Sequence, residues 1–183
     1  MRAGNQREYE FRNALFRDAA YASLTDDDRE LGHRLAAAWL KESGDVEALV
    51  LAEHFERGGR PEHAVEWYLR AGQQALEGSD LEAAVTRAQR GIDGGASREQ
   101  RGMLRLLQAE ACKWQGKNAD GQRFALEAME CLLPHSPAWC SAVGEAAAAS
   151  GKLGDFGGAA RRSVRPCSTP RRARKTRPLC SPP

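Results

Sequence analysis

The chain has 183 residues, of which 42% are apolar and 28% charged, and its formal net charge at pH 7 is +2. This length suits one domain or a short stack of repeated units that share a core. Val and Thr are few and Ile92 is the one isoleucine, which argues against a fold built on strands.

Two helices are predicted at the start of the chain. The first covers about residues 6–24, and the second begins at Thr25, which forms a capping-box variant with Asp28 and places acid at the positive end of the helix dipole. We expect the first helix to bury Phe11, Leu15, Ala19 and Ala22, and the second to bury Leu31, Leu35, Ala38 and Trp39.

A helix, a tight break and another helix follow. Asp45 is placed to cap the third helix, and Gly58 and Gly59 end it. Pro61 then stands in the first turn of a fourth helix, about residues 61–77. That helix has two apolar stripes, so it must be covered on two sides: Ala64, Tyr68, Ala71 and Ala75, and Val65, Leu69, Gly72 and Leu76.

Capping residues divide the rest of the chain into further helices. Four starts are expected in order: at Ser79 or Asp80, at Ser97 with Gln100 as a capping box, after Asn118, and at Ser136 with Pro137. A ninth helix is expected from Asp155 to about Val164. The proline- and arginine-rich residues 165–183 have no periodic face, so we expect a disordered basic tail.

Small residues recur at intervals of 38 residues. Gly78, Gly116 and Gly154 each end an expected helix. In the same step come Ala71, Ala109 and Ala147 in the first helix of each unit, and Ala83, Gly121 and Ala159 in the second. Antiparallel helices approach closely only where their crossing points carry small side chains. The spacing therefore predicts an internal repeat, in an all-α, right-handed solenoid of antiparallel helix pairs.

The residues around the Gly-Gly break resemble the tetratricopeptide repeat. The pattern is a small residue, an aromatic, alanine, aromatic and alanine, and it is carried by Leu51, Ala52, Phe55, Ala64, Tyr68 and Ala71. The later units fit less well, because they lack the aromatic at Ala125 and Ser163. The resemblance implies a divergent tetratricopeptide-like array over residues 45–164.

A second resemblance covers about residues 9–133. The segments YEFRNALFRDAAYASLTDDDRELGHRLAAAWL and LAEHFERGGRPEHAVEWYLRAGQQAL are similar to the region after the nucleotide-binding module of bacterial STAND-class signalling ATPases, including those fused to serine/threonine kinases or nucleotide cyclases. The resemblance implies that residues 1–44 follow an ATPase module. No GxxxxGK[ST] loop, kinase glycine loop or HRD segment occurs, so this chain lacks the ATPase and kinase cores.

Candidate catalytic and metal-binding groups are weak. His54 and His63 flank the break beside Glu53 and Glu56, but they do not form an HExxH pair, and zinc needs three or four converging ligands. Cys112 or Cys131 with His135 lacks an orienting third group. We expect no catalytic residue, no metal and no cofactor. The five cysteines form no CxxC pair, which favours reduced thiols.

The sequence predicts a non-catalytic protein-interaction scaffold in the cytoplasm, because the first residues are too charged for a secretory signal and no apolar run is as long as a membrane span. Trp67, beside the two buried stripes, is the expected contact with a protein or peptide partner. The alternative is nucleic-acid binding through the tail. Residues 161–183 carry eight Lys and Arg and no acid, which leaves 19 basic against 25 acidic residues elsewhere.

Overall fold

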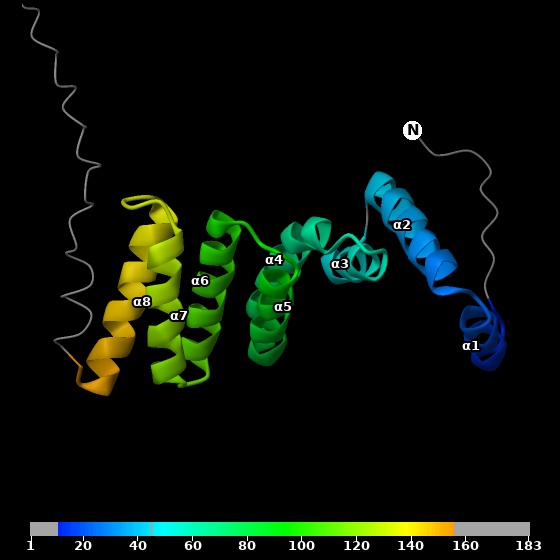
Figure 1. The fold of residues 1–183 in the computed structure, drawn as a ribbon. Coiled ribbons are helices and arrows are strands. Elements are labelled where there is room, and N and C mark those ends of the chain that lie inside the picture. Colours follow the sequence, from blue (N-terminus) through cyan, green and yellow to red (C-terminus); the bar gives the residue numbers. More distant parts are fainter. Residues whose placement is uncertain (1–10, 45, 156–183) are drawn as a thin grey trace, which may run out of the picture.

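The computed structural model describes residues 11–44 and 46–155. Every regular element within these residues is a helix, so the expected all-α fold is confirmed at that level. Figure 1 shows the helices in one row that follows chain order. The described helices are α1 (Ala14–Ala22), α2 (Asp26–Ser43), α3 (Ala48–Arg57), α4 (Pro61–Glu77), α5 (Leu81–Asp93), α6 (Arg98–Trp114), α7 (Asn118–Cys131) and α8 (Pro137–Leu153).

Several of the sequence predictions concern residues outside the described ranges. Residues 156–183 contain nearly all of the expected ninth helix, the repeat position Ala159 and the basic tail. Asp45, the expected cap of the third helix, is also outside. The structure starts α3 at Ala48 instead, after Glu47, whose side chain makes no capping hydrogen bond.

Most helix starts and ends follow the local sequence. The Thr25 hydroxyl accepts a hydrogen bond from the Asp28 amide at the start of α2. Ser97 and Gln100 form the reciprocal capping box of α6, and Pro61 occupies the first turn of α4. These signals act within a few residues, so they do not depend on the tertiary fold.

The expected inner faces of the first two helices are wrong. Helix α1 is shorter than predicted and has no buried residue, so Leu15 is exposed. In α2 the only buried residue is Ala37, while Leu31 and Leu35 are exposed. Helix α2 packs against α3 through a different side, on which Arg34 donates a hydrogen bond from Nη1 to the Gly58 carbonyl at 3.1 Å. The apolar stripe of α2 therefore points away from the array.

The core lies between successive helices from α3 onward. One cluster joins α4, α5 and α6, and another joins α6, α7 and α8. The members of the first are Val65, Ala75, Ala84, Ala88, Ile92, Ala96, Leu104, Leu107 and Ala111. The members of the second are Ala109, Cys112, Phe124, Ala125 and Ala146. Each helix from α4 to α7 is thus covered by the helix before it and the helix after it.

Small residues mark the closest approaches between these helices. A Cβ atom on Gly121 would lie 3.5 Å from both the Ala109 carbonyl oxygen and the Cys112 Cβ, so two of the predicted repeat positions meet where α6 crosses α7. Two further glycines stand at tighter places. A Cβ on Gly91 would come within 3.1 Å of Leu104, and one on Gly102 within 2.7 Å of Leu132. Larger side chains at these glycines would force the helices apart.

The repeat is in phase at two of its three first-helix positions. Ala71 in α4 and Ala109 in α6 are buried, whereas Ala147 in α8 is exposed. The side of α8 that packs on α7 carries Ala142, Ala146 and Ala149. Among the described helices nothing covers the opposite side, and the helix that was expected to cross at Ala147 lies outside the described residues.

Candidate functional site

The other positions singled out in the sequence divide into buried and half-buried residues. Ala52, Ala64, Tyr68 and Gly121 are buried. Phe55 is partly buried against Ala52, Ala64 and Tyr68, and Ala83 is partly buried against the cluster that joins α4, α5 and α6. Trp67, the expected partner contact, is also partly buried. Its indole packs on the cluster of Ala52, Ala64 and Tyr68, and the Arg70 guanidinium lies 4.7 Å from its ring centroid. Trp67 therefore offers only part of its surface to a partner.

The histidines near the Gly-Gly break do not come together. His63 lies 3.1 Å from a Glu62 carboxylate oxygen and stacks on Phe55. His54 points instead to His33 of α2. Within residues 11–44 and 46–155, no group of three or more His, Cys, Asp or Glu side chains is placed to hold a metal ion.

The Cys112 thiol is buried in the cluster that joins α6, α7 and α8. Burial, reinforced by the negative charge of Asp120, raises the pKa of Cys112. A thiol that stays protonated is a poor nucleophile, so Cys112 behaves as a small apolar core residue.

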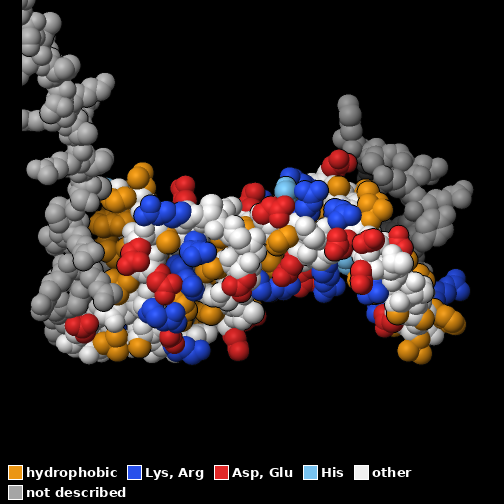
Figure 2. Space-filling model, in the orientation of Figure 1, with side chains coloured by type: hydrophobic (Ala, Val, Ile, Leu, Met, Phe, Trp, Pro, Cys, Tyr) orange, Lys and Arg blue, Asp and Glu red, His pale blue; other side chains and the backbone are white. Residues whose placement is uncertain are grey.

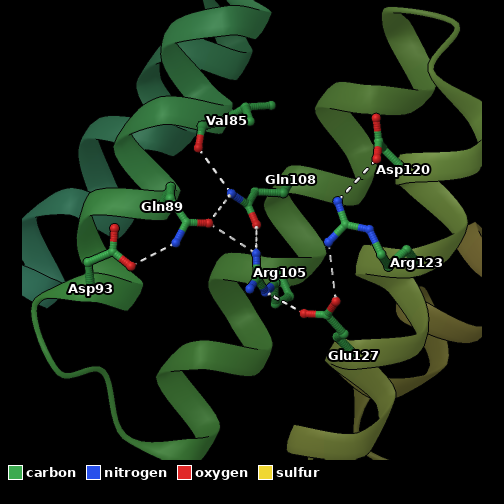
Figure 3. Close-up of polar contacts among 8 residues, drawn as sticks. All are labelled: Val85, Gln89, Asp93, Arg105, Gln108, Asp120, Arg123 and Glu127. Atoms are coloured by element: carbon green, nitrogen blue, oxygen red, sulfur yellow. Dashed lines mark hydrogen bonds and ion pairs between the residues drawn. The ribbon is translucent and has the colours of Figure 1, made fainter.

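A polar network joins α5, α6 and α7 (Figure 3). At its centre is Gln108, which is 1% exposed. Its Nε2 donates to the Val85 carbonyl at 3.1 Å, and its Oε1 accepts from Arg105 Nη1 at 2.7 Å. A buried amide without partners would be costly. Because both ends of this amide are satisfied by neighbouring groups, the network favours one rotation of α6 against α5.

The network continues from Arg105 to α7. Arg105 Nε lies 2.8 Å from Glu127 Oε2, but its N–H does not point at that oxygen, so the contact is an ion pair and not an aligned hydrogen bond. Glu127 also faces Arg123 at 3.4 Å. The two guanidiniums lie 5.1 and 4.2 Å from the Phe124 ring centroid. Arg105 therefore ties α6 to α7 by charge and by contact with an aromatic ring.

A second polar cluster joins α3, α4 and α5. The Tyr68 ring is buried and its hydroxyl donates to Glu56. Arg90 of α5 bridges Glu53 at 3.1 Å and Glu56 at 2.6 Å. Burial and the bond to Glu56 raise the pKa of Tyr68. Burial alone would raise the pKa of Glu56, but the bonds from Tyr68 and Arg90 outweigh it, and the pKa of Glu56 is lowered.

Exposed apolar side chains on α1 and on α2 are the third feature. On α2, Leu31, Leu35 and Trp39 lie one turn apart and are 48%, 62% and 54% exposed. On α1, Leu15 and Phe16 are exposed as well. In Figure 2 apolar side chains stand out at both ends of the array, at α1 and at α8, whereas acidic and basic side chains alternate along its middle. Contiguous apolar surface of this kind marks an interaction site more often than scattered single residues do.

A small pocket lies between α6, α7 and α8, where Lys113 and Glu145 form an ion pair of 2.6 Å. The space is about large enough to hold one water molecule. The ion pair at this place joins α6 to α8.

Sequence reasoning missed the polar network and the contact between His33 and His54. Gln108 carries one weak signal, because it interrupts the apolar run MLRLLQAEAC one turn after the buried Leu104. Nothing in the sequence pairs His33 with His54, since 21 residues and a loop separate them.

Comparisons with family models, curated proteins and solved structures found no match to this chain. None of the helices within residues 11–155 that the structure describes is both long and apolar enough to cross a membrane.

Proposed function

We propose that the chain is a non-catalytic protein-interaction scaffold, the sensor or partner-binding arm of a STAND-type ATPase or serine/threonine kinase regulator in signal transduction. The proposal includes a right-handed, tetratricopeptide-like solenoid over residues 45–164. Its supports are the row of helices in Figure 1, the buried Ala71 and Ala109, and the resemblance of residues 9–133 to such regulators.

The observation that carries this proposal is the exposed apolar stripe of α2. Leu31, Leu35 and Trp39 leave about half of their surface in water. Full burial of such a side chain contributes about 1.5–3 kcal/mol, so covering the exposed half contributes roughly half of that. Their packing against a second protein surface would recover that free energy. We assign this face to contact with the ATPase module that the resemblance places before residues 1–44.

The remaining array would then receive the partner. Helices α3 to α8 are held in fixed register by the two polar clusters and the small-residue crossings. Docking of a partner shifts the conformational equilibrium of an attached module only if the partner has different affinities for the two states of that module. A rigid array can transmit such a shift from the docked partner to the module.

Replacing Leu31 and Leu35 together by glutamate tests this assignment. Two charges in the stripe should abolish docking of the ATPase module, while the fold should survive because neither side chain is buried. The tagged chain is purified from the cells that make it, and the proteins that accompany it are identified by mass spectrometry. The expected result is a signalling ATPase that is retained by the natural chain and lost with the double variant.

Leu133→Glu is the matched control, because Leu133 is 73% exposed in the loop between α7 and α8. This variant should retain the same ATPase. If no nucleotide-binding regulator distinguishes the two variants, the assignment of the α2 stripe is wrong.

Nucleic-acid binding remains the alternative function. The observation that favours it is that residues 161–183 contain eight Lys and Arg and no acidic residue. Binding of this kind should fall steeply as salt is added. Removal of the residues after Val164 separates the two functions. Loss of DNA or RNA affinity with unchanged helical circular dichroism would favour the alternative, whereas capture of the ATPase by the shortened chain would favour the scaffold.

A further inference from the structure

A chain of three side chains links the first three helices. The Tyr21 hydroxyl of α1 lies 2.9 Å from His33 Nε2 of α2, and His33 Nδ1 lies 3.0 Å from His54 Nδ1 of α3. Two facing nitrogens form a hydrogen bond only when one carries a proton and the other is a free acceptor. The contact between His33 and His54 therefore tolerates one proton between the two Nδ1 atoms and not two.

This contact lies where α1 and α2, which we call the α1–α2 arm, join the array of helices α3 to α8. Of the described helices, α2 packs substantially only on α3, and Ala37 is the only residue that α2 buries. The remaining polar tie is the hydrogen bond from Arg34 to the Gly58 carbonyl. Because α2 buries little apolar surface against α3, a change of charge at His33 and His54 makes up a large part of the free energy that holds α2 on α3.

The surrounding charges favour the neutral imidazoles. Burial, the charge of the opposite imidazole and Arg57 lower the pKa of His33. Burial and Arg57 lower the pKa of His54, against an opposing effect of Glu53. Glu53 is shared with Arg90 at 3.1 Å and Arg57 at 3.8 Å, which limits its effect on His54.

The other helices near the pair add few charges. On α2 itself, Glu30 and Arg34 pair with each other at 3.3 Å, and the Arg29 guanidinium lies 5.6 Å from the Tyr21 ring centroid. From α4, His63 stacks on Phe55 and contacts Glu62. The α1 contact to the pair is the Tyr21 hydroxyl. None of these groups places an unshared carboxylate against either imidazole.

We propose that the contact between His33 and His54 is a proton-sensitive latch, which holds the α1–α2 arm on α3 at neutral pH and releases it when both imidazoles are protonated. On release, both Nδ1–H groups gain water as an acceptor and the two charges separate. The latch does not depend on which protein the α2 stripe binds, so it can be tested apart from the proposed function.

The direction of the pH effect follows from linkage. In the released arm both pKa values return toward the ordinary 6.5, whereas docking lowers them. The released state therefore binds more protons between the lowered values and about 6.5. Docking is complete above this window, weakens as the pH falls through it, and becomes constant again below the lowered values. Each proton taken up can raise the opening constant by up to about tenfold per pH unit.

Amide hydrogen exchange of the full chain at pH 7.5 and pH 5.5 tests the latch, after correction for the intrinsic exchange rate. The amides of α2 should open about tenfold more often at the lower pH, relative to those of α6 in the same sample. His33→Gln and His54→Gln keep a hydrogen-bonding side chain without a titrating group, so the pH dependence should weaken in each and vanish when both are replaced. His63→Gln, a histidine that stacks on Phe55 and contacts neither His33 nor His54 in the described residues, should retain it.

Two results would overturn the latch. One is a natural chain whose ratio of α2 to α6 opening is equal at the two pH values, and the other is a pH dependence that survives both glutamine replacements. If both variants are already open at pH 7.5, NMR titration of the natural chain decides. His33 and His54 must then titrate below the ordinary pKa of 6.5, and titration of both at that value would contradict the proposal.

Discussion

Ala71→Trp is expected to destabilise the array by about 1–3 kcal/mol or more, because Ala71 is fully buried in α4 and an indole would have to push a neighbouring helix away. For a chain of this length that cost lowers Tm by roughly 2 to 12 °C. Ala109→Trp, where α6 meets Gly121 of α7, should have a similar effect. Thermal unfolding followed by circular dichroism at 222 nm measures both.

Ala147→Trp is the matched control. Ala147 stands at the same phase of the repeat but is exposed on α8, so the indole should fit without strain and leave Tm nearly unchanged. A fall in Tm as large as that of Ala71→Trp would show that α8 is covered on that side. An unchanged Tm for Ala71→Trp would contradict the crossing itself.

Tyr68→Ala is expected to have the largest effect of any single truncation, about 3–5 kcal/mol, because Tyr68 is the largest of the fully buried side chains. The change leaves a cavity between α3, α4 and α5 and removes the ring beneath the Arg90 guanidinium, 4.7 Å from its centroid. Urea unfolding at neutral pH gives the free energy of unfolding directly.

Tyr68→Phe separates the two contributions of this residue. It keeps the ring and removes the hydrogen bond to Glu56, which should cost about 1–3 kcal/mol. Glu56 keeps its ion pair with Arg90 at 2.6 Å, so the variant should remain folded. If Tyr68→Phe cost as much as Tyr68→Ala, packing of the ring would not be the source of stability at this junction.

Local signals in the sequence were reliable because they involve few residues. The capping box of Ser97 and Gln100 and the position of Pro61 each satisfy backbone groups within one turn of a helix. Gly116 and Gly154 both adopt positive φ at the ends of their helices, at 74° and 71°. Such features form in the same way whatever the helix later packs against.

The buried faces of the amphipathic helices were less predictable. In α4 both apolar stripes are covered, as predicted, because α3 and α5 lie on its two sides. In α2 the apolar stripe faces outward, and the side with His33, Arg34 and Ala37 packs on α3. Periodicity indicates that a helix has an apolar face but does not identify what covers it.

The polar clusters could not be inferred from spacing. Arg90 reaches Glu56 across 34 residues and Gln108 reaches Val85 across 23 residues. Each pairing depends on the rotation of two helices about their axes, which the 38-residue period leaves open. The glycine crossings at Gly91 and Gly102 were missed for a related reason, because their large neighbours Leu104 and Leu132 lie on other helices or loops.

The proposed function is inferred from exposed apolar side chains and not from a catalytic or ligand-binding group. The charged side chains of the described array pair with one another, mostly within one helix, as Arg70 does with Glu66, and in some cases across helices, as Lys113 does with Glu145. Most of the large apolar side chains left in water lie on or beside α1 and α2, and the others, such as Trp114 and Leu133, are spread along the array. If the proposal is correct, the α1–α2 arm carries the contact with the catalytic module and the contact between His33 and His54 sets how firmly that arm is held.

The central claim is that neighbouring helices cover the small residues at the crossings of α4 and α6. Single cysteines at positions 71, 109 and 147, in a background without the five native cysteines, test it through their rate of reaction with a water-soluble maleimide. We predict slow reaction for Ala71→Cys and Ala109→Cys and rapid reaction for Ala147→Cys in the folded chain. Equally rapid reaction at all three positions would contradict the account.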